Sequence, residues 1–358
     1  MTATRRANAL VHGLEKLEHK LARTLLEWVI KVPTALLSRF GQKLDGERLH
    51  PEIQLLLALR ERMGDTMLAH GSVERSRQRM RRDARVHQGV PIPVGAVHDL
   101  TFPGAVGALR ARHYVPAGAN VGQPRPLLVF FHGGGFVLGD LDTHDLPCRA
   151  LCRELDVHVL SAEYRLAPEH PFPAGVEDAR AALRFAQAHA AKLGADPGRV
   201  GVAGDSAGAN LATVATQLAV QTGEPVPVLQ LLIYPAVDST KDWPSIDLFA
   251  DGFLLTRADV HWFRKLYFGS FADLADPRAS PLLAKDLSGM PPTVIVTAGF
   301  DPLRDEGEAY AAALAQAGVR TTLHRVPDLV HGFINLGAVS GAAKQALKQV
   351  AELTRELL

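Results

Sequence analysis

The chain of 358 residues has few of the features that mark specialised protein classes. It has only two cysteines, Cys148 and Cys152, too few for a secreted fold held together by disulfides. No histidine stands at zinc-finger spacing from them, so we expect both thiols to be buried and reduced. Aromatic residues make up only 6% of the chain, and no apolar run approaches the ~20 residues that span a bilayer.

Net charge is almost absent as well. Lys and Arg number 39 against 38 Asp and Glu, while 47% of the residues are hydrophobic. This balance excludes a disordered chain and is typical of a globular protein. The first 90 residues, however, hold 17 Lys/Arg and 10 Asp/Glu. Such a surplus can attract nucleic acid or an anionic membrane, but no nucleic-acid-binding pattern accompanies it. We therefore expect a solvated helical face and no nucleic-acid partner.

The N-terminal segment shows no apolar stretch followed by a small-residue cleavage site, so we expect no signal peptide and a cytoplasmic location. Apolar residues at helical spacing predict an amphipathic helix over 8–32, within an N-terminal extension of residues 1–45. Three roles stay open for this extension. It could add to a cap or to a homodimer surface, contact a membrane peripherally, or remain disordered.

After this extension, the pattern of apolar and polar residues indicates an α/β fold. Helices are predicted over 51–62 and 72–87, and 89–95 reads as a linker. Strands and helices then alternate, which predicts a mostly parallel sheet covered by helices on both faces. The predicted strands are 97–102, 109–115, 127–131, 157–164, 199–204, 228–234, 293–299 and 321–327, with helices over 174–192, 206–221 and 303–317. Ligands of such sheets bind beyond the carboxyl ends of the strands, so we expect the catalytic and binding residues directly after the strands.

A Gly-x-Ser-x-Gly pattern follows the predicted strand 199–204 and opens a helix. Its residues are Gly204, Asp205, Ser206, Ala207 and Gly208. In this context the pattern predicts a nucleophile elbow, in which a tight strand-to-helix turn exposes the serine hydroxyl. Side chains at positions 204 and 208 would collide with the neighbouring backbone, which explains the two glycines.

A glycine triplet follows the predicted strand 127–131, in the segment His132 to Phe136. Three glycines allow backbone N–H groups to face a cavity without obstruction by Cβ atoms. Such donors stabilise the negative charge that develops on oxygen during acyl transfer. The segment is therefore a candidate oxyanion hole, with an ordinary glycine-rich turn as the alternative.

A serine nucleophile needs a base, and the base needs a carboxylate that orients it. Asp301 follows the strand 293–299, and His331 lies in a loop after the strand 321–327. The order Ser206, Asp301, His331 is that of α/β-hydrolases. The rivals of His331 are His144 and His170, and those of Asp301 are Asp305 and Glu306, whose other role is to face a helix N-terminus.

Together these residues give the chain a specific resemblance. It resembles the bacterial hormone-sensitive lipase family of α/β-hydrolases, also called family IV esterases, from about residue 50 to 358. The matching segments, in family order, are HGGGFVLGDLDTHD (132–145), EYRLAPEHPFPAG (163–175), GDSAGAN (204–210), DPLRDEGEAYA (301–311) and HGF (331–333). One departure is Ala209, where the family commonly has a third glycine.

The resemblance implies a serine carboxylesterase for short-to-medium-chain acyl esters that works through an acyl-enzyme, without metal or organic cofactor. It carries the catalytic roles to Ser206, Asp301 and His331, and the oxyanion donors to the amides of Gly134, Gly135 and Ala207. It also implies a helical cap, formed here by residues 46–88 and an insertion near 239–270 in a catalytic domain of residues 89–358.

The insertion is rich in aromatic residues and leucine, and we expect its apolar residues to form both the core of the cap and one wall of the acyl pocket. We expect that pocket to include Phe136, Phe249, Phe253 and Leu254. Other enzymes use the same triad, so an amidase, a deacetylase or a lactonase stays open. A non-catalytic ligand-binding protein on a hydrolase fold is a further alternative.

Overall fold

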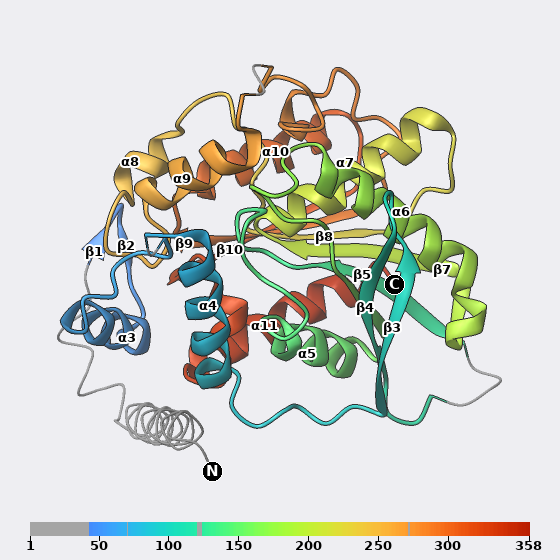
Figure 1. Cartoon of the computed structure of the whole chain (residues 1–358), viewed down its shortest axis with the longest axis horizontal. Helices are drawn as coiled ribbons and strands as arrows, with labels where there is room; N and C mark the ends of the chain where they lie inside the picture. Colours follow the sequence, from blue (N-terminus) through green and yellow to red (C-terminus); the bar gives the residue numbers. More distant parts are fainter. Residues whose placement is uncertain (1–42, 70, 120–123, 271–272) are drawn as a thin grey trace, which may run out of the picture.

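The computed structural model describes residues 43–69, 71–119, 124–270 and 273–358 (Figure 1). At its centre lies an eight-stranded sheet of order β10-β9-β8-β7-β5-β6-β4-β3. All neighbouring strands are parallel except β4, which runs antiparallel to β3 and β6. The strands are β3 (Ala96–Pro103), β4 (Ala108–Val115), β5 (Arg125–Phe131), β6 (His158–Ala162), β7 (Ala195–Asp205), β8 (Gln230–Ile233), β9 (Thr293–Phe300) and β10 (Thr321–Val330). The predicted α/β class, and a strand at each predicted position, are confirmed.

The sheet is buried on both faces, as the continuous apolar runs of its strands require. In β5, Leu127, Val129 and Phe131 enter one hydrophobic core. Leu128 and Phe130 point the other way and enter a second core. Two layers of helices must therefore cover the sheet.

Helices form these two layers, as Figure 1 shows. One core is covered by α6 (Ala174–His189), α7 (Ala207–Thr222) and α10 (Arg304–Gln316). The other is covered by α5 (Asp145–Leu155) and α11 (Gly341–Arg355), which pack on each other. The first three match predicted helices, whereas α5 and α11 have no counterpart among them. Short 3₁₀ turns are η2 (Ala191–Leu193), η3 (Pro281–Leu283) and η4 (Phe333–Leu336).

Four further helices come from two distant stretches of sequence. The first stretch holds the β1–β2 hairpin (Lys43–Leu44 and Glu47–Arg48), α3 (Pro51–Arg62) and α4 (Val73–His87), and the second holds α8 (Pro244–Leu248) and α9 (Arg257–Phe268). The helices predicted over 51–62 and 72–87 are thus present.

The buried carboxylate of Asp259 in α9 joins the two stretches. One of its oxygens accepts the N–H groups of Leu68 and Ala69 at 3.0 and 2.8 Å. Its other oxygen accepts from the Thr256 hydroxyl, which begins the same helix. One side chain of α9 therefore binds the backbone between α3 and α4 and also the start of its own helix.

Two arginines of α4 bind carboxylates on other elements. Arg77 reaches Glu169 at 2.7 Å, and Arg81 reaches Asp140 at 2.6 Å. Both cysteines, in α5, are free and buried. In the part of the chain that the structure describes, we find no helix with the length and apolar character to traverse a bilayer. The helix predicted over 8–32 lies outside the described residues.

Candidate active site

Ser206 stands in a tight turn between β7 and α7. Its backbone φ of +55° is rare for residues other than glycine. Its N–H donates to the carbonyl of Ile233 on the next strand. A Cβ at Gly204 would lie 2.4 Å from the backbone of Gly208, and one at Gly208 would lie 2.0 Å from the carbonyl oxygen of Phe131. Only glycine fits either position, so the backbone has the geometry of a nucleophile elbow.

The structure brings Ser206, His331 and Asp301 together. The Oγ of Ser206 lies 3.0 Å from Nε2 of His331, and Nδ1 of that ring lies 2.8 Å from Oδ2 of Asp301. The other oxygen of Asp301 accepts the N–H of Leu303 at 2.8 Å. Because a carboxylate faces Nδ1, the proton of the neutral ring belongs there, which leaves Nε2 free to accept the serine proton.

Tyr234 supports this arrangement, although nothing in the sequence patterns points to it. It follows β8, and its ring centroid lies 4.4 Å from that of His331. Its hydroxyl donates to Oδ2 of Asp205 at 3.3 Å. One buried side chain thus packs against the imidazole and also contacts the residue before the serine.

The glycine triplet lies against the same turn. Gly134 and Gly135 have φ values of +115° and +61°, and both line a cavity together with Ser206 and Ala207. A Cβ at Gly135 would lie 2.2 Å from the Phe263 ring of α9. The triplet therefore lets the chain turn closely under α9.

Two buried aromatic side chains hold the start of this loop. Nδ1 of His132 lies 2.8 Å from the carbonyl oxygen of Gly133, and the hydroxyl of Tyr164 donates to the carbonyl of His132 at 2.7 Å. Burial lowers the pKa of His132 to about 4. His132 is therefore neutral and positions the loop.

The cavity beside Ser206 measures about 180 Å³ and is walled mainly by apolar side chains. Phe136 and Leu254 line it, as expected, and so do Val260, Phe263 and Phe268 of α9 and Met80 of α4. The expectation for Phe249 and Phe253 needs correction. Both rings pack on Phe300 in the core next to the sheet, at centroid distances of 5.7 and 5.3 Å, and neither lines the cavity.

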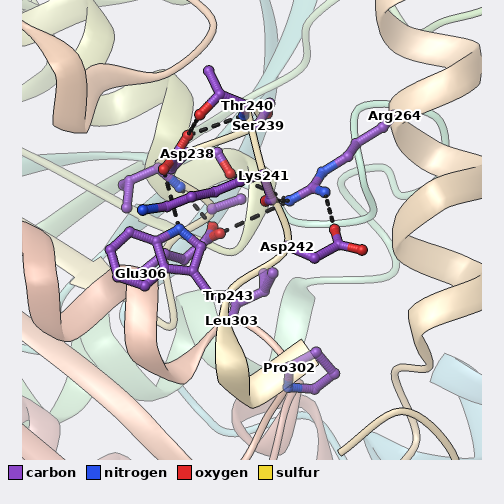
Figure 2. A network of polar contacts seen from close by, with 12 residues as sticks. Asp238, Ser239, Thr240, Lys241, Asp242, Trp243, Arg264, Pro302, Leu303 and Glu306 are labelled. Atoms are coloured by element: carbon purple, nitrogen blue, oxygen red, sulfur yellow. Dashed lines mark hydrogen bonds and ion pairs between the residues drawn. The ribbon is translucent and has the colours of Figure 1, made fainter. Parts of the chain in front are cut away.

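Some residues of the polar network in Figure 2 belong to the wall of the cavity. Asp238, Arg264 and Glu306 all line it. The guanidinium of Arg264 binds Asp242 at 2.7 Å and lies 4.0 Å from Oε2 of Glu306. Trp243 donates its indole N–H to Asp238 at 3.1 Å. This network connects α9 and α10 with the loop after β8.

The rival candidates lie elsewhere or bind other partners. His170 is not among the cavity residues, and Asp305 accepts the N–H of Ser245 at 2.9 Å. Glu306 accepts the N–H of Val237 at 2.8 Å. His144 does line the cavity, but its Nε2 lies 3.3 Å from Asp205 and not beside the serine. Across the described ranges, we find no group of three or more His, Cys, Asp or Glu side chains that could hold a metal ion.

Comparison with known proteins agrees with this geometry. Residues 128–335 match a family model described as the alpha/beta hydrolase fold. The chain belongs to this family. The esterase is also 47% identical over 340 residues, 92% of its length, to the carboxylic ester hydrolase LipN of Mycobacterium tuberculosis, of which 89% is covered. It is 35% identical to an ethyl acetate hydrolase of Pseudomonas putida, over 87% of this chain and 99% of that one.

Solved structures show the same likeness. An esterase of the archaeon Pyrobaculum calidifontis superposes with a TM-score of 0.80 at 38% identity, over 86% of this chain and 98% of that one. An ester hydrolase from the metagenome of Lake Arreo gives a TM-score of 0.83 at 40% identity, with the same coverage. The resemblance to family IV esterases is confirmed, and the protein is a carboxylic ester hydrolase that acts on small-molecule esters.

Proposed function

We propose that Ser206 attacks the carbonyl carbon of short-to-medium-chain esters, with His331 as general base and Asp301 as its orienting carboxylate. The observation that carries the proposal is the chain of contacts from Ser206 Oγ to His331 Nε2 at 3.0 Å and from His331 Nδ1 to Asp301 at 2.8 Å. A serine hydroxyl with an oriented imidazole at this distance can lose its proton as it attacks.

The reaction then proceeds in two balanced halves. The serine oxygen bonds to the carbonyl carbon while its proton passes to His331. The carbonyl oxygen takes up the negative charge, held by the amides of Gly134, Gly135 and Ala207. His331 gives the proton to the departing alcohol, which leaves an acyl group on Ser206. Water repeats the sequence with His331 as base and releases the carboxylic acid and the free serine.

The cavity favours small substrates. Its volume of about 180 Å³ is below the roughly 300–1,000 Å³ of pockets that hold drug-sized ligands. Residues 46–88 and the insertion near 239–270 would act as a cap, because α4 and α9 supply many of the side chains that line the cavity.

Substitution of Ser206 tests the proposal. Ser206→Ala should abolish hydrolysis of p-nitrophenyl butyrate and covalent labelling by a fluorophosphonate while the melting temperature is kept. Ser161→Ala is the matched control, because Ser161 is a buried serine of β6 that does not line the cavity. Turnover that survives in Ser206→Ala would overturn the assignment. Matched anilides and lactones in the same assay test the amidase, deacetylase and lactonase alternatives.

Location and partners are further parts of the proposal. We infer a cytoplasmic protein, because both cysteines are free and buried. Residues 8–32 would add to the cap or to a homodimer surface, and contact with an anionic membrane is the alternative. Co-sedimentation of the full chain and of a variant lacking residues 1–45 with anionic vesicles distinguishes them, since equal partitioning removes the membrane role.

A further inference from the structure

The candidate oxyanion hole is assembled from two separate segments. Gly134 and Gly135 belong to the loop after β5, whereas Ala207 belongs to the turn after β7. Three amides can share one oxygen only if the two segments keep a fixed separation, because a hydrogen bond weakens steeply with distance and angle. Some contact between the segments must therefore set that separation.

The side chain of Asp205 provides this contact. Asp205 precedes the serine, is only 3% exposed, and accepts the N–H of Gly133 on Oδ1 at 2.7 Å. A carboxylate that accepts a backbone N–H makes one of the stronger hydrogen bonds of proteins. It holds the amide immediately before the two glycine donors, and the covalent chain joins it to the serine and to Ala207.

A buried carboxylate so close to the developing oxyanion would also oppose it by repulsion, unless its charge is offset. His144 lies beside the same oxygen of Asp205, with Nε2 3.3 Å from Oδ1, and a proton on Nε2 places an N–H against the carboxylate. The ring is held by the Thr143 hydroxyl, 3.0 Å from Nδ1.

Electrostatics agree with this geometry. Burial alone would raise the pKa of the Asp205 carboxyl, but its contacts with His144 and with the Gly133 N–H outweigh that effect and hold the pKa below its usual value. The carboxyl is therefore ionised when it accepts the Gly133 N–H.

We propose that Asp205 and His144 are positioning residues of the oxyanion hole, in which Asp205 fixes the glycine loop to the elbow and His144 orients Asp205 and offsets its charge. The inference rests on the proposed roles of Ser206 and of the three amides. Neither side chain needs to touch the ester, so both should affect the transition state and leave binding of the ground-state ester unchanged.

A transition-state analogue separates these effects. The Ser206 oxygen adds to the carbonyl carbon of an aliphatic trifluoromethyl ketone, and the serine proton passes to His331. The former carbonyl oxygen of the ketone then carries the negative charge. Its inhibition constant is compared with the KM of p-nitrophenyl butyrate in the wild type, His144→Phe and Asp205→Asn. His113→Phe is the matched control, because His113 is also a buried histidine in polar contact, at 2.9 Å from His158, but it does not line the cavity.

Asp205→Asn and His144→Phe should each lower kcat and weaken analogue binding by a similar factor, roughly ten- to a hundredfold, with KM nearly unchanged. His113→Phe should leave all three constants as in the wild type. The inference would be overturned if Asp205→Asn and His144→Phe only lower the melting temperature and leave the ratio of inhibition constant to KM unchanged. Failure of the proposed function is seen separately, as wild-type protein inactive on the butyrate or as Ser206→Ala that retains activity.

Discussion

Glu306 illustrates how far burial can change the state of a single residue. It lies in the first turn of α10, is 1% exposed, and accepts the N–H of Val237 on one oxygen. Its other oxygen has no hydrogen-bond partner among the residues that the structure describes. Arg264 lies 4.0 Å away, but its guanidinium is engaged by Asp242 (Figure 2). Burial raises the pKa of Glu306 to about 8, and Asp238 and Asp301 act in the same direction.

This raised pKa predicts a pH-dependent cost in stability. The unfolded chain loses the Glu306 proton near pH ~4.3, whereas the folded protein keeps it until about pH 8. Between these values the folded state binds more protons, so the free energy of unfolding falls as pH rises. Glu306→Gln keeps an oxygen for the Val237 N–H but does not titrate. Its melting temperature should therefore rise relative to the wild type between pH 5 and pH 8.

The control for this experiment is Glu308→Gln. Glu308 is a carboxylate of the same helix that binds Arg325 at 2.6 Å near the surface, and its loss should give no such gain. A constant difference in melting temperature between Glu306→Gln and the wild type, from pH 5 to pH 8, would contradict an uncharged Glu306.

At the scale of elements, the elbow between β7 and α7 depends on the absence of side chains. A Cβ at Gly208 would meet the carbonyl oxygen of Phe131 at 2.0 Å, and backbone on both sides leaves no flexible group that could yield. Gly208→Ala should therefore displace Ser206 and lower kcat/KM by about a hundredfold or more. The measurement is hydrolysis of p-nitrophenyl butyrate together with thermal unfolding.

Gly175 in α6 is the matched control, because an added Cβ would meet only Tyr164, Arg165 and Leu211 at ordinary contact distances. Gly175→Ala should keep activity and gain roughly 0.5–1 kcal/mol of stability from the helical backbone. Equal activity of the two variants would show that the elbow tolerates movement.

The elements that the sequence predicts well are those with a local signal. The apolar run 127–131 lies within β5, and the elbow appears where glycines flank the serine after an apolar strand. By contrast, α11 carries no catalytic motif and lies at the end of the chain, and no prediction covers it. Leu347 and Val350 of α11 are buried, and the helix packs against α5.

The site shows the same division between local and tertiary information. Ser206, Asp301 and His331 each follow a predicted strand, and because ligands of parallel sheets bind beyond the carboxyl ends of the strands, the sequence could predict that these residues lie near one another. Phe249 and Phe253 are apolar residues of the insertion, and the sequence cannot tell the face that meets Phe300 from the face that meets substrate. The contacts of Tyr234 and His144 with Asp205 depend on how three distant segments pack.

At the scale of the whole molecule, side chains from α4 and α9 line the cavity together with residues of the catalytic core. We expect p-nitrophenyl butyrate to be hydrolysed much faster than the palmitate, because a chain of sixteen carbons exceeds a cavity of about 180 Å³. Phe263→Ala removes a ring that lines the cavity beside Gly135 and should raise the decanoate-to-butyrate ratio of kcat/KM.

The control is Phe249→Ala, which removes a buried ring that does not line the cavity. The cavity left in the core should lower the free energy of unfolding by about 3–5 kcal/mol, which is seen as a lower melting temperature. The preference for acyl-chain length should not change. A similar change of profile in both variants would show that general loosening, and not pocket size, sets the preference.

The shared carboxylate of Asp259 has a consequence for building chimeras with relatives of this esterase. Grafting a foreign stretch in place of residues 46–88 while keeping α9 would deprive Asp259 of the native geometry of Leu68 and Ala69. Grafting the insertion alone, without an aspartate at this position, would leave those two amides without an acceptor. Specificity can therefore be transplanted between such enzymes only if both stretches are exchanged as a pair.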